Sequence, residues 1–285
     1  MKAYVMDAFS EKLFGGNQAG VALPERPLSD AVMQQIAAEF KHSETAFVTV
    51  NDDGSVTLRY FTPAGEVDLC GHATIASFAL LRQEGLIADG SHIAHTKASD
   101  LNIGVSGGTV WMDMAPPKLI RKLTAEEWPE LYDAYGLTVD HRPDGLEPWI
   151  VSTGLADIML PVRDHETLLR AVQNEAAVTE LSRRYDVTGV HMFCPGGEDC
   201  TAYCSNYAPL YDILEECATG TSNGALTYYL YLHGMVRPEE ENLFVQGEHM
   251  HRPSQIRSRL YDDGGTVTVR IGGSAVMSMR CDIKL

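Results

Sequence analysis

The chain has 285 residues, of which 45% are hydrophobic, and it carries a formal net charge of −17 at pH 7. This acidic excess excludes a protein built to bind the phosphate backbone of nucleic acids, because such proteins concentrate lysine and arginine. Its length and apolar content allow a sizeable core, and we expect about two domains. No segment reaches the roughly 18 to 20 apolar residues of a membrane span, and the first residues lack a signal-peptide layout. We therefore expect a cytoplasmic protein with no membrane partner.

The first half of the chain is predicted to form short strands around two helices. Strand-like segments bounded by Gly, Pro, Asn or Asp occur at 3–9, 19–24, 44–50, 56–62, 92–98 and 109–115. One helix is expected at 28–40 with Ser29 as its cap, and another at 71–85, where it ends on glycine. The proline pair and charged stretch of 116–137 break this pattern, so we place a domain junction near residue 118.

The second half contains the same kinds of element. Strands are expected at 148–155, 157–163, 190–196, 201–208, 242–248 and 266–283. Helices are expected at 165–185 and 222–234. We expect the charged segment that follows the second helix to be a solvated loop.

A short internal repeat relates the two halves. The segment YFTPAGEVDLCGHAT contains Cys70, and NYAPLYDILEECATGT contains Cys217. Each has an aromatic residue, one residue, a proline, a spacer, then a cysteine, two small or polar residues and a threonine. After each comes a helix that is apolar nearly all the way round, closed by Gly85 or Gly234. A helix of this kind must be buried, most simply inside a sheet.

The repeat predicts an α+β fold with two pseudo-symmetric domains, each a mainly antiparallel sheet wrapped around a central helix. We expect the domains at 1–118 and 119–285, with the C-terminal strands able to cross back to the first half. A pseudo-twofold relation would let the two helix N-termini face each other across one cleft.

The two repeated cysteines are candidate acid/base groups. A helix start exposes free backbone N–H groups and the positive end of the macrodipole, so it lowers the pKa of a thiol there. Cys70 and Cys217 would then form a proton-transfer pair, one thiolate removing a proton from one face of a carbon and the other thiol returning one to the opposite face. Such chemistry needs no cofactor. The alternative is that both cysteines are small core residues.

Three other polar residues are candidates with structural alternatives. His72 follows Cys70 closely and could be catalytic, orienting or simply a polar cap. Glu44 interrupts an apolar strand-like run, and it is either a solvent-facing strand residue or an acid/base group in the cleft. Glu216 could be a catalyst or a favourable charge ahead of a helix.

A second group of cysteines invites a metal hypothesis. His191, Cys194, Cys200 and Cys204 lie close in sequence, but their spacings are not paired CxxC modules and they fall on two strands joined by a loop. We expect structural thiols here, no metal site, and six free cysteines in the chain.

Several segments together resemble the PhzF family of phenazine-biosynthesis isomerases, within the diaminopimelate-epimerase-like fold. They are MDAFSEKLFGGNQAGVAL, SETAFV, RYFTPAGEVDLCGHATIAS, CSNYAP and QGEHMHRPS. The resemblance runs from residue 1 to about 255, and EVDLCGHAT is its specific motif. It implies two pseudo-symmetric halves with the active site between them, a homodimer, and no metal or organic cofactor.

The resemblance assigns catalytic roles residue by residue. The family's glutamate falls on Glu44, its histidine on His72, and its acidic residue on Glu216. We expect the substrate to be bound by Asn17, Ser43, Gly71, Thr219, Gly220 and Thr221. The sequence departs from the family pattern where Glu216-Cys217 replaces an Asp-Pro pair and where Gln18 replaces a proline.

The departure at Cys217 resembles the second cysteine motif of diaminopimelate epimerase and proline racemase. The sequence therefore favours a cofactor-independent isomerase that moves a proton at or near the α-carbon of a small carboxylate substrate. It could be an amino acid racemase or epimerase that uses Cys70 and Cys217. The alternatives are a PhzF-like double-bond isomerase driven by Glu44, and a non-catalytic ligand-binding protein of the same fold.

Overall fold

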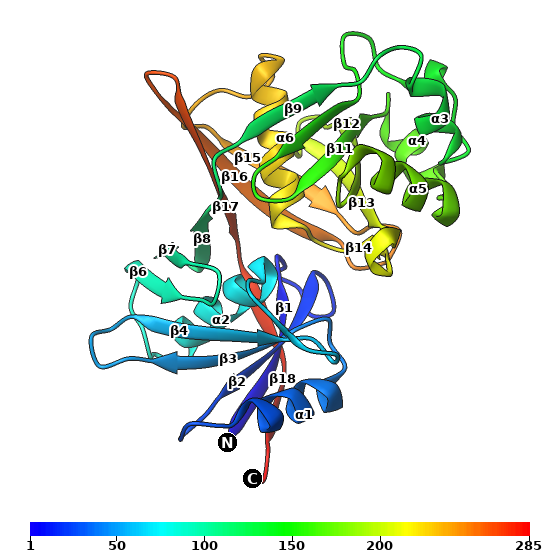
Figure 1. The fold of residues 1–285 in the computed structure, drawn as a ribbon. Helices are drawn as coiled ribbons and strands as arrows, with labels where there is room; N and C mark the ends of the chain where they lie inside the picture. Colours follow the sequence, from blue (N-terminus) through cyan, green and yellow to red (C-terminus); the bar gives the residue numbers. More distant parts are fainter. The chain divides into compact units, whose positions relative to one another are not determined.

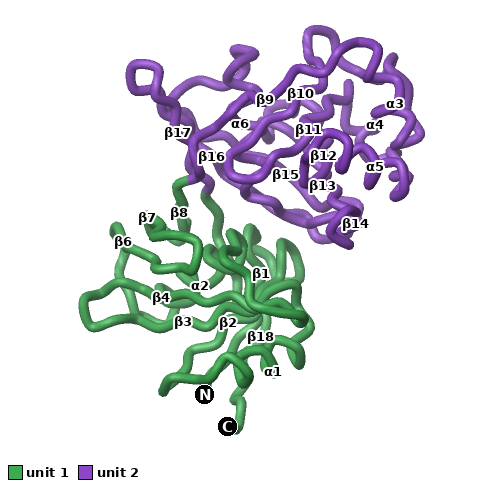
Figure 2. Tube along the Cα trace, viewed as in Figure 1, with its two compact units in different colours: residues 1–113, 272–285 green, residues 114–271 purple.

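The computed structural model describes residues 1–285, which divide into two compact units (Figure 2). Unit 1 comprises Met1–Asp113 together with Gly272–Leu285, and unit 2 comprises Met114–Ile271. The chain therefore passes between the units twice. None of the helices combines the length and the apolar content that a membrane span requires.

Unit 1 is a mixed sheet with two helices (Figure 1). Its elements are β1 (Lys2–Ala8), β2 (Asn17–Leu23), α1 (Asp30–Phe40), β3 (Thr45–Val50), β4 (Val56–Phe61), β5 (Glu66–Val67), α2 (Gly71–Gln83), β6 (Gly90–His95), β7 (Asp100–Ser106), β8 (Thr109–Asp113) and β18 (Ala275–Asp282). Strand β1 pairs antiparallel with β2 and with β18, so the end of the chain completes this unit.

Helix α2 is the buried helix of unit 1. Every residue from His72 to Leu81 is buried, and the helix contacts β1, β2, β3, β8 and β18. The hydroxyl of Ser77 is satisfied within the helix, where it donates to the carbonyl of Ala73 at 2.6 Å. The chain leaves the helix through Gly85, at a φ of +69° that favours glycine. The predicted all-round burial is confirmed.

Helix α1 covers a different part of the unit 1 sheet. Its predicted cap is confirmed, because the Ser29 side chain accepts a hydrogen bond from the backbone N–H of Val32. One face of the helix buries Met33, Ile36 and Ala37, at the i, i+3, i+4 spacing of an amphipathic helix. These side chains join a core cluster with Ala3, Ala22, Phe47 and Phe61.

Unit 2 contains a second sheet and four α-helices (Figure 1). Its strands are β9 (Lys118–Lys122), β10 (Trp149–Ser152), β11 (Ala156–Pro161), β12 (Gly189–Pro195), β13 (Ala202–Ala208), β14 (Ile213–Glu216), β15 (Glu241–Gln246), β16 (Ser254–Asp263) and most of β17 (Thr266–Gly273). Its helices are α3 (Trp128–Asp133), α4 (His165–Arg170), α5 (Glu175–Tyr185) and α6 (Gly220–Leu232), with 3₁₀ turns at Val139–His141 and Pro209–Tyr211.

The two units share one order of strand pairings. In unit 1, β2 is parallel to β3, β3 is antiparallel to β4, and β4 is antiparallel to β5 and parallel to β6. In unit 2, β11, β12, β13, β14 and β15 pair in the same sequence and with the same directions. Helix α6, buried on nearly every face, holds the place that α2 holds in unit 1. The prediction of an α+β fold with two similar halves is confirmed.

Some local predictions were wrong. The expected single helix at 165–185 is two helices, because the chain extends at Ala171 and Asn174 then caps α5. No element was predicted in the segment 116–137, which holds β9 and α3. Strands β7 and β16 were not predicted, since their exposed polar positions hide the strand pattern.

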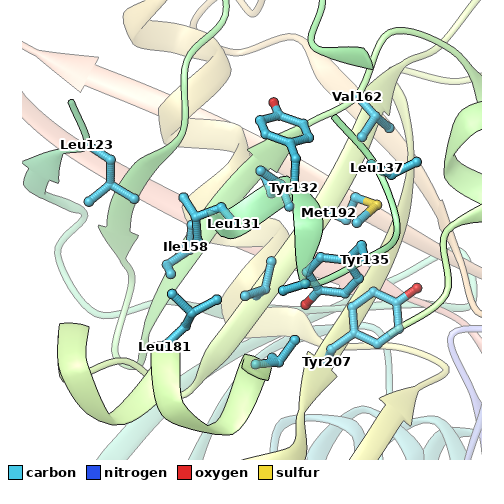
Figure 3. Close-up of a cluster of buried hydrophobic side chains, with 14 of the residues drawn as sticks. Leu123, Leu131, Tyr132, Tyr135, Leu137, Ile158, Val162, Leu181, Met192 and Tyr207 are labelled. Atoms are coloured by element: carbon cyan, nitrogen blue, oxygen red, sulfur yellow. The ribbon is translucent and has the colours of Figure 1, made fainter. Parts of the chain in front are cut away.

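A large apolar core in unit 2 lies beneath α3, α4 and α5 (Figure 3). Leu181 of α5, Ile158 of β11 and Met192 of β12 are fully or almost fully buried in it. Tyr135 and Tyr207 pack against each other at a centroid distance of 5.1 Å. This core fixes one face of the sheet, and the opposite face carries α6.

Candidate active site

Three of the predicted residues meet in unit 1 at the start of α2. The Sγ atom of Cys70 lies 3.4 Å from Nδ1 of His72. The other ring nitrogen of His72, Nε2, lies 3.3 Å from Oε2 of Glu44. Cys70 and His72 are buried, whereas the Glu44 side chain is 21% exposed. The imidazole therefore links a thiol on one side to a carboxylate on the other.

The local fold explains why this cluster forms. Strands β4 and β5 make a short hairpin that delivers Cys70 to the N-cap position of α2. The Thr74 hydroxyl donates to the carbonyl of Cys70 at 2.7 Å, and it also bonds the buried hydroxyl of Tyr60 at 2.7 Å. Glu44 immediately precedes β3, and its partly exposed side chain lies toward His72.

The cluster can move a proton. A neutral His72 with its proton on Nε2 donates to Glu44 and can accept the Cys70 proton at Nδ1, which leaves a thiolate beside an imidazolium that the carboxylate stabilises. The same donor set could also hold a metal, because the three ligand atoms lie within 4.8 Å of one another and a thiolate, an imidazole and a carboxylate are ligands that zinc accepts.

Two of the remaining unit 1 candidates, Ser43 and Gly71, lie at this cluster. Ser43 contacts it directly, because its hydroxyl lies 3.4 Å from Nε2 of His72. Gly71 is the first residue of α2, so its backbone lies at the helix start. Asn17 is buried at the first position of β2, opposite Ala8.

The second predicted cysteine lies in unit 2, on the loop between β14 and α6. Cys217 is 7% exposed, and helix α6 begins three residues later, at Gly220, after the N-cap residue Thr219. The Thr219 hydroxyl lies 3.5 Å from the Glu216 carboxylate. Cys217 is thus set back from the helix start, whereas Cys70 occupies the N-cap itself.

This difference corrects the expectation that both thiols have a lowered pKa. Burial, the largest effect, raises the pKa of Cys217 above its ordinary value. The guanidinium of Arg252 acts in the opposite direction, and the carboxylate of Glu216 adds to the rise. Cys217 is therefore held as a protonated thiol at neutral pH.

Thr219, Gly220 and Thr221 all lie at the N-terminus of α6, which begins two residues before the expected start at 222. Thr221 uses its carbonyl to accept a hydrogen bond from the Thr153 hydroxyl at 2.7 Å. Gly220 is the first helical residue. Gly220 and Thr221 are the first two residues of the helix, where backbone N–H groups lack intrahelical partners and would stabilise a substrate carboxylate. The N–H of Thr219 instead donates to the side chain of Gln246 at 3.2 Å.

A buried polar network that the sequence did not predict joins α6 to β11, β12 and β13. Ser222 donates to the Asp157 carboxylate at 2.5 Å, and Asn206 donates to the Ser222 hydroxyl at 3.1 Å and contacts Nδ1 of His191 at 3.2 Å. Burial lowers the pKa of His191 to about 3, so this histidine is neutral. Such contacts join residues far apart in sequence, so no local pattern could reveal them.

The buried Asp157 should make the stability of the protein depend on pH. Burial raises its pKa from 3.8 to about 6, so between these values the folded state holds a proton that the unfolded state has lost. Stability from this group is present below about pH 4 and lost as the pH rises through about 6. We therefore compare the free energies of unfolding of Asp157→Asn and the wild type by urea unfolding at pH 4 and at pH 7.5. The difference between them should shift in favour of the variant by about 3 kcal/mol from the lower to the higher pH. A difference between the two proteins that is the same at both pH values would contradict this assignment.

The other cysteines of unit 2 are buried thiols. Cys194, Cys200 and Cys204 are all free and buried, and burial raises the pKa of each. Their high pKa values oppose the thiolate form that metal binding requires.

Comparison with known proteins places this geometry in context. The model of the PhzC-PhzF family, described as phenazine biosynthesis-like protein, matches residues 6–281. An uncharacterized isomerase of Deinococcus radiodurans is 34% identical over 272 residues, which cover 92% of this chain and 88% of that protein.

Solved structures show the same fold. The PhzF family protein of Bacillus anthracis superposes with a TM-score of 0.89 at 26% identity, covering 100% of this chain and 99% of that one. A probable proline racemase of Agrobacterium radiobacter superposes with a TM-score of 0.63 at 11% identity, covering 100% and 93% of the two chains. The second likeness concerns the fold alone.

Proposed function

The chain belongs to the PhzC-PhzF family of phenazine biosynthesis-like proteins and is an isomerase, and we propose that it moves a proton at or near the α-carbon of a small carboxylate substrate without a cofactor. The observation that carries this proposal is the contact of His72 with both Cys70 and Glu44. Proton transfer to and from carbon needs an acid/base group whose proton can be passed on, and this cluster supplies one.

The cluster connects the two candidate bases, Cys70 and Glu44, through one histidine. Cys70 and Glu44 are both within contact of one imidazole, so a proton taken by the thiolate can pass through His72 to the carboxylate. The thiol and the carboxylate can thus act in series through His72. Ser43, at the same ring nitrogen as Glu44, helps fix the orientation of the imidazole.

The specific form that we propose is a racemase or epimerase that uses two thiols. Its support is the sequence repeat, in which Cys217 matches Cys70 and, together with Glu216, stands where the family resemblance implies an Asp-Pro pair. The two thiols are unequal. Cys70 lies against a proton acceptor, whereas burial keeps Cys217 protonated. In the resting enzyme, Cys70 is then the base and Cys217 the acid, so one substrate enantiomer meets the correct protonation states at once.

The alternative function is a double-bond isomerisation in which Glu44 is the main acid/base. The observation in its favour is that Glu44 is the most exposed member of the cluster, so its carboxylate can reach a substrate directly. In this form, His72 orients Glu44 and both cysteines only pack.

The proposed activity can be tested by hydrogen exchange at carbon. We expect the wild-type protein, incubated in deuterated water with a panel of L- and D-α-amino acids and hydroxy acids, to replace the α-hydrogen of at least one compound, seen by NMR. Exchange with inversion supports the two-thiol form. Tight binding of a panel member by calorimetry without any deuterium incorporation would instead indicate a ligand-binding protein that has lost turnover.

A further inference from the structure

The cluster at the start of α2 presents three side chains of the kinds that bind zinc. Cys70 offers a sulfur atom, His72 a ring nitrogen and Glu44 a carboxylate oxygen, and the three atoms lie within 4.8 Å of one another. Nε2 of His72 lies 3.9 Å from Sγ of Cys70 and 3.3 Å from Oε2 of Glu44. Sulfur and nitrogen ligands beside a carboxylate are typical of zinc sites, whereas calcium and magnesium prefer oxygen ligands alone.

These separations are close to those that a tetrahedral zinc ion imposes on its ligands. Zinc binds sulfur at about 2.3 Å and nitrogen or oxygen at about 2.0–2.2 Å, so tetrahedral angles place sulfur roughly 3.6 Å from nitrogen and nitrogen roughly 3.4 Å from oxygen. The observed 3.9 and 3.3 Å differ from these values by only a few tenths of an ångström. The third separation, from sulfur to oxygen, can close through rotation of the Glu44 side chain, which is partly exposed.

Charge also favours a divalent cation at this place. The Cys70 thiolate and the Glu44 carboxylate together supply two negative charges, so a complex of Zn²⁺ with these groups and neutral His72 has no net charge, which suits a largely buried cluster. The N-terminus of α2 opposes a cation with only about half a positive charge. The thiol proton passes to solvent when the zinc–sulfur bond forms. The exposed side of Glu44 gives the ion a path into the cluster.

We propose that Zn²⁺ binds to Cys70, His72 and Glu44 and thereby inhibits the protein reversibly. The ion would occupy the same groups that the proton relay uses. Its binding therefore removes the base and blocks the path of the proton. Three protein ligands leave the fourth position of the tetrahedron open to water. The zinc site itself depends only on the geometry, whereas its inhibitory effect rests on the proposed function.

Binding of cobalt(II), a coloured substitute for zinc, tests the site without any turnover. The reduced, metal-free wild-type protein is titrated with cobalt(II) chloride without oxygen and followed by absorption. We expect a sulfur-to-cobalt charge-transfer band, which added Zn²⁺ abolishes by displacing the cobalt. Cys70→Ala should lose this band. Glu44→Gln should keep the band but bind cobalt at least about tenfold more weakly, because even changes outside the ligand shell weaken metal affinity by about 10- to 100-fold.

Cys281 provides the matched control, because it is the exposed thiol of the chain and the others are buried. Cys281→Ser should keep both the band and the wild-type affinity. A band that is lost in Cys281→Ser and kept in Cys70→Ala would indicate an adventitious ion only and would overturn the proposal. The same conclusion follows if the wild type shows no band, or if Glu44→Gln binds cobalt as tightly as the wild type.

The inhibitory effect is measured separately, by hydrogen exchange at carbon with whichever panel compound the wild type exchanges. We expect exchange to stop when zinc saturates the site and to resume when a chelator removes the ion. Mg²⁺ at the same concentration should have no effect, because it prefers oxygen ligands. Exchange at the full rate with the site saturated would overturn the inhibitory role. Cobalt binding as expected, without exchange of any panel compound, would support the zinc site while counting against the proposed function.

Discussion

Replacing Cys217 by serine should lower the rate at which solvent deuterium enters the substrate carbon by about 10³-fold, within the range that general acid–base catalysis contributes. A serine hydroxyl is a far weaker acid than a thiol with a pKa of about 8.5, so it cannot supply the proton that the second face of the carbon requires. The change in volume is small, so folding should be retained. The measurement is the loss of the α-hydrogen NMR signal in deuterated water with whichever panel compound the wild type exchanges.

Two further variants distinguish the two-thiol mechanism from the mechanism in which Glu44 is the main acid/base. Cys200→Ser, which changes another buried thiol of the same unit, should exchange at the wild-type rate. Glu44→Gln removes the carboxylate that contacts His72. Full activity in Cys217→Ser together with inactivity in Glu44→Gln would reject the two-thiol mechanism and assign the chemistry to Glu44.

Replacing Gly247 by alanine should destabilise the protein by about 2–4 kcal/mol and reduce the activity of the molecules that remain folded. Gly247 has a φ of +87°, and its added Cβ would meet the Arg252 carbonyl oxygen at 2.7 Å as well as the backbone of Cys217. To relieve this clash, either the turn from Gly247 to Arg252 or the loop that carries Cys217 must move. The side chain of Gln246, the residue before Gly247, is hydrogen-bonded to that loop. Urea unfolding gives the loss of stability, and exchange at carbon gives the loss of activity.

The control for backbone strain is Gly264→Ala. Gly264 has a φ of +60°, and nothing lies within 4 Å of the position that an alanine Cβ would take there. The substitution should therefore cost only the left-handed conformation, about 1 kcal/mol, and leave activity unchanged. Equal effects of the two substitutions would mean that the close contact between Gly247 and Cys217 is unimportant.

The sequence could predict those features of the fold that have a local cause. The buried helices α2 and α6 follow from runs that are apolar on every face, and the start of α1 follows from the Ser29 cap. The repeat around Cys70 and Cys217 corresponds to a real structural repeat, in which a strand pair leads into each buried helix. The break between α4 and α5 was missed because the helical period continues across it.

The candidate site was only partly predictable, because only some of its contacts join residues that are close in sequence. His72 and Cys70 are two residues apart, so their contact is local, and the family motif indicated Glu44. The environment of Cys217 depends instead on Gln246, which lies about thirty residues downstream in sequence and reaches the cysteine loop only through strand pairing. Its raised pKa could not be predicted, because burial is a property of the folded chain.

The pairing of β18 with β1 has a consequence for biosynthesis. The ribosome makes β1 before β18, and the whole of unit 2 is synthesised between them. The sheet of unit 1 can therefore be completed only after β18 has been translated, whereas unit 2 is one contiguous segment that precedes β18. Until then, one edge of β1 lacks its neighbour, so a nascent chain stalled before β18 would present an open strand edge to chaperones or to aggregation.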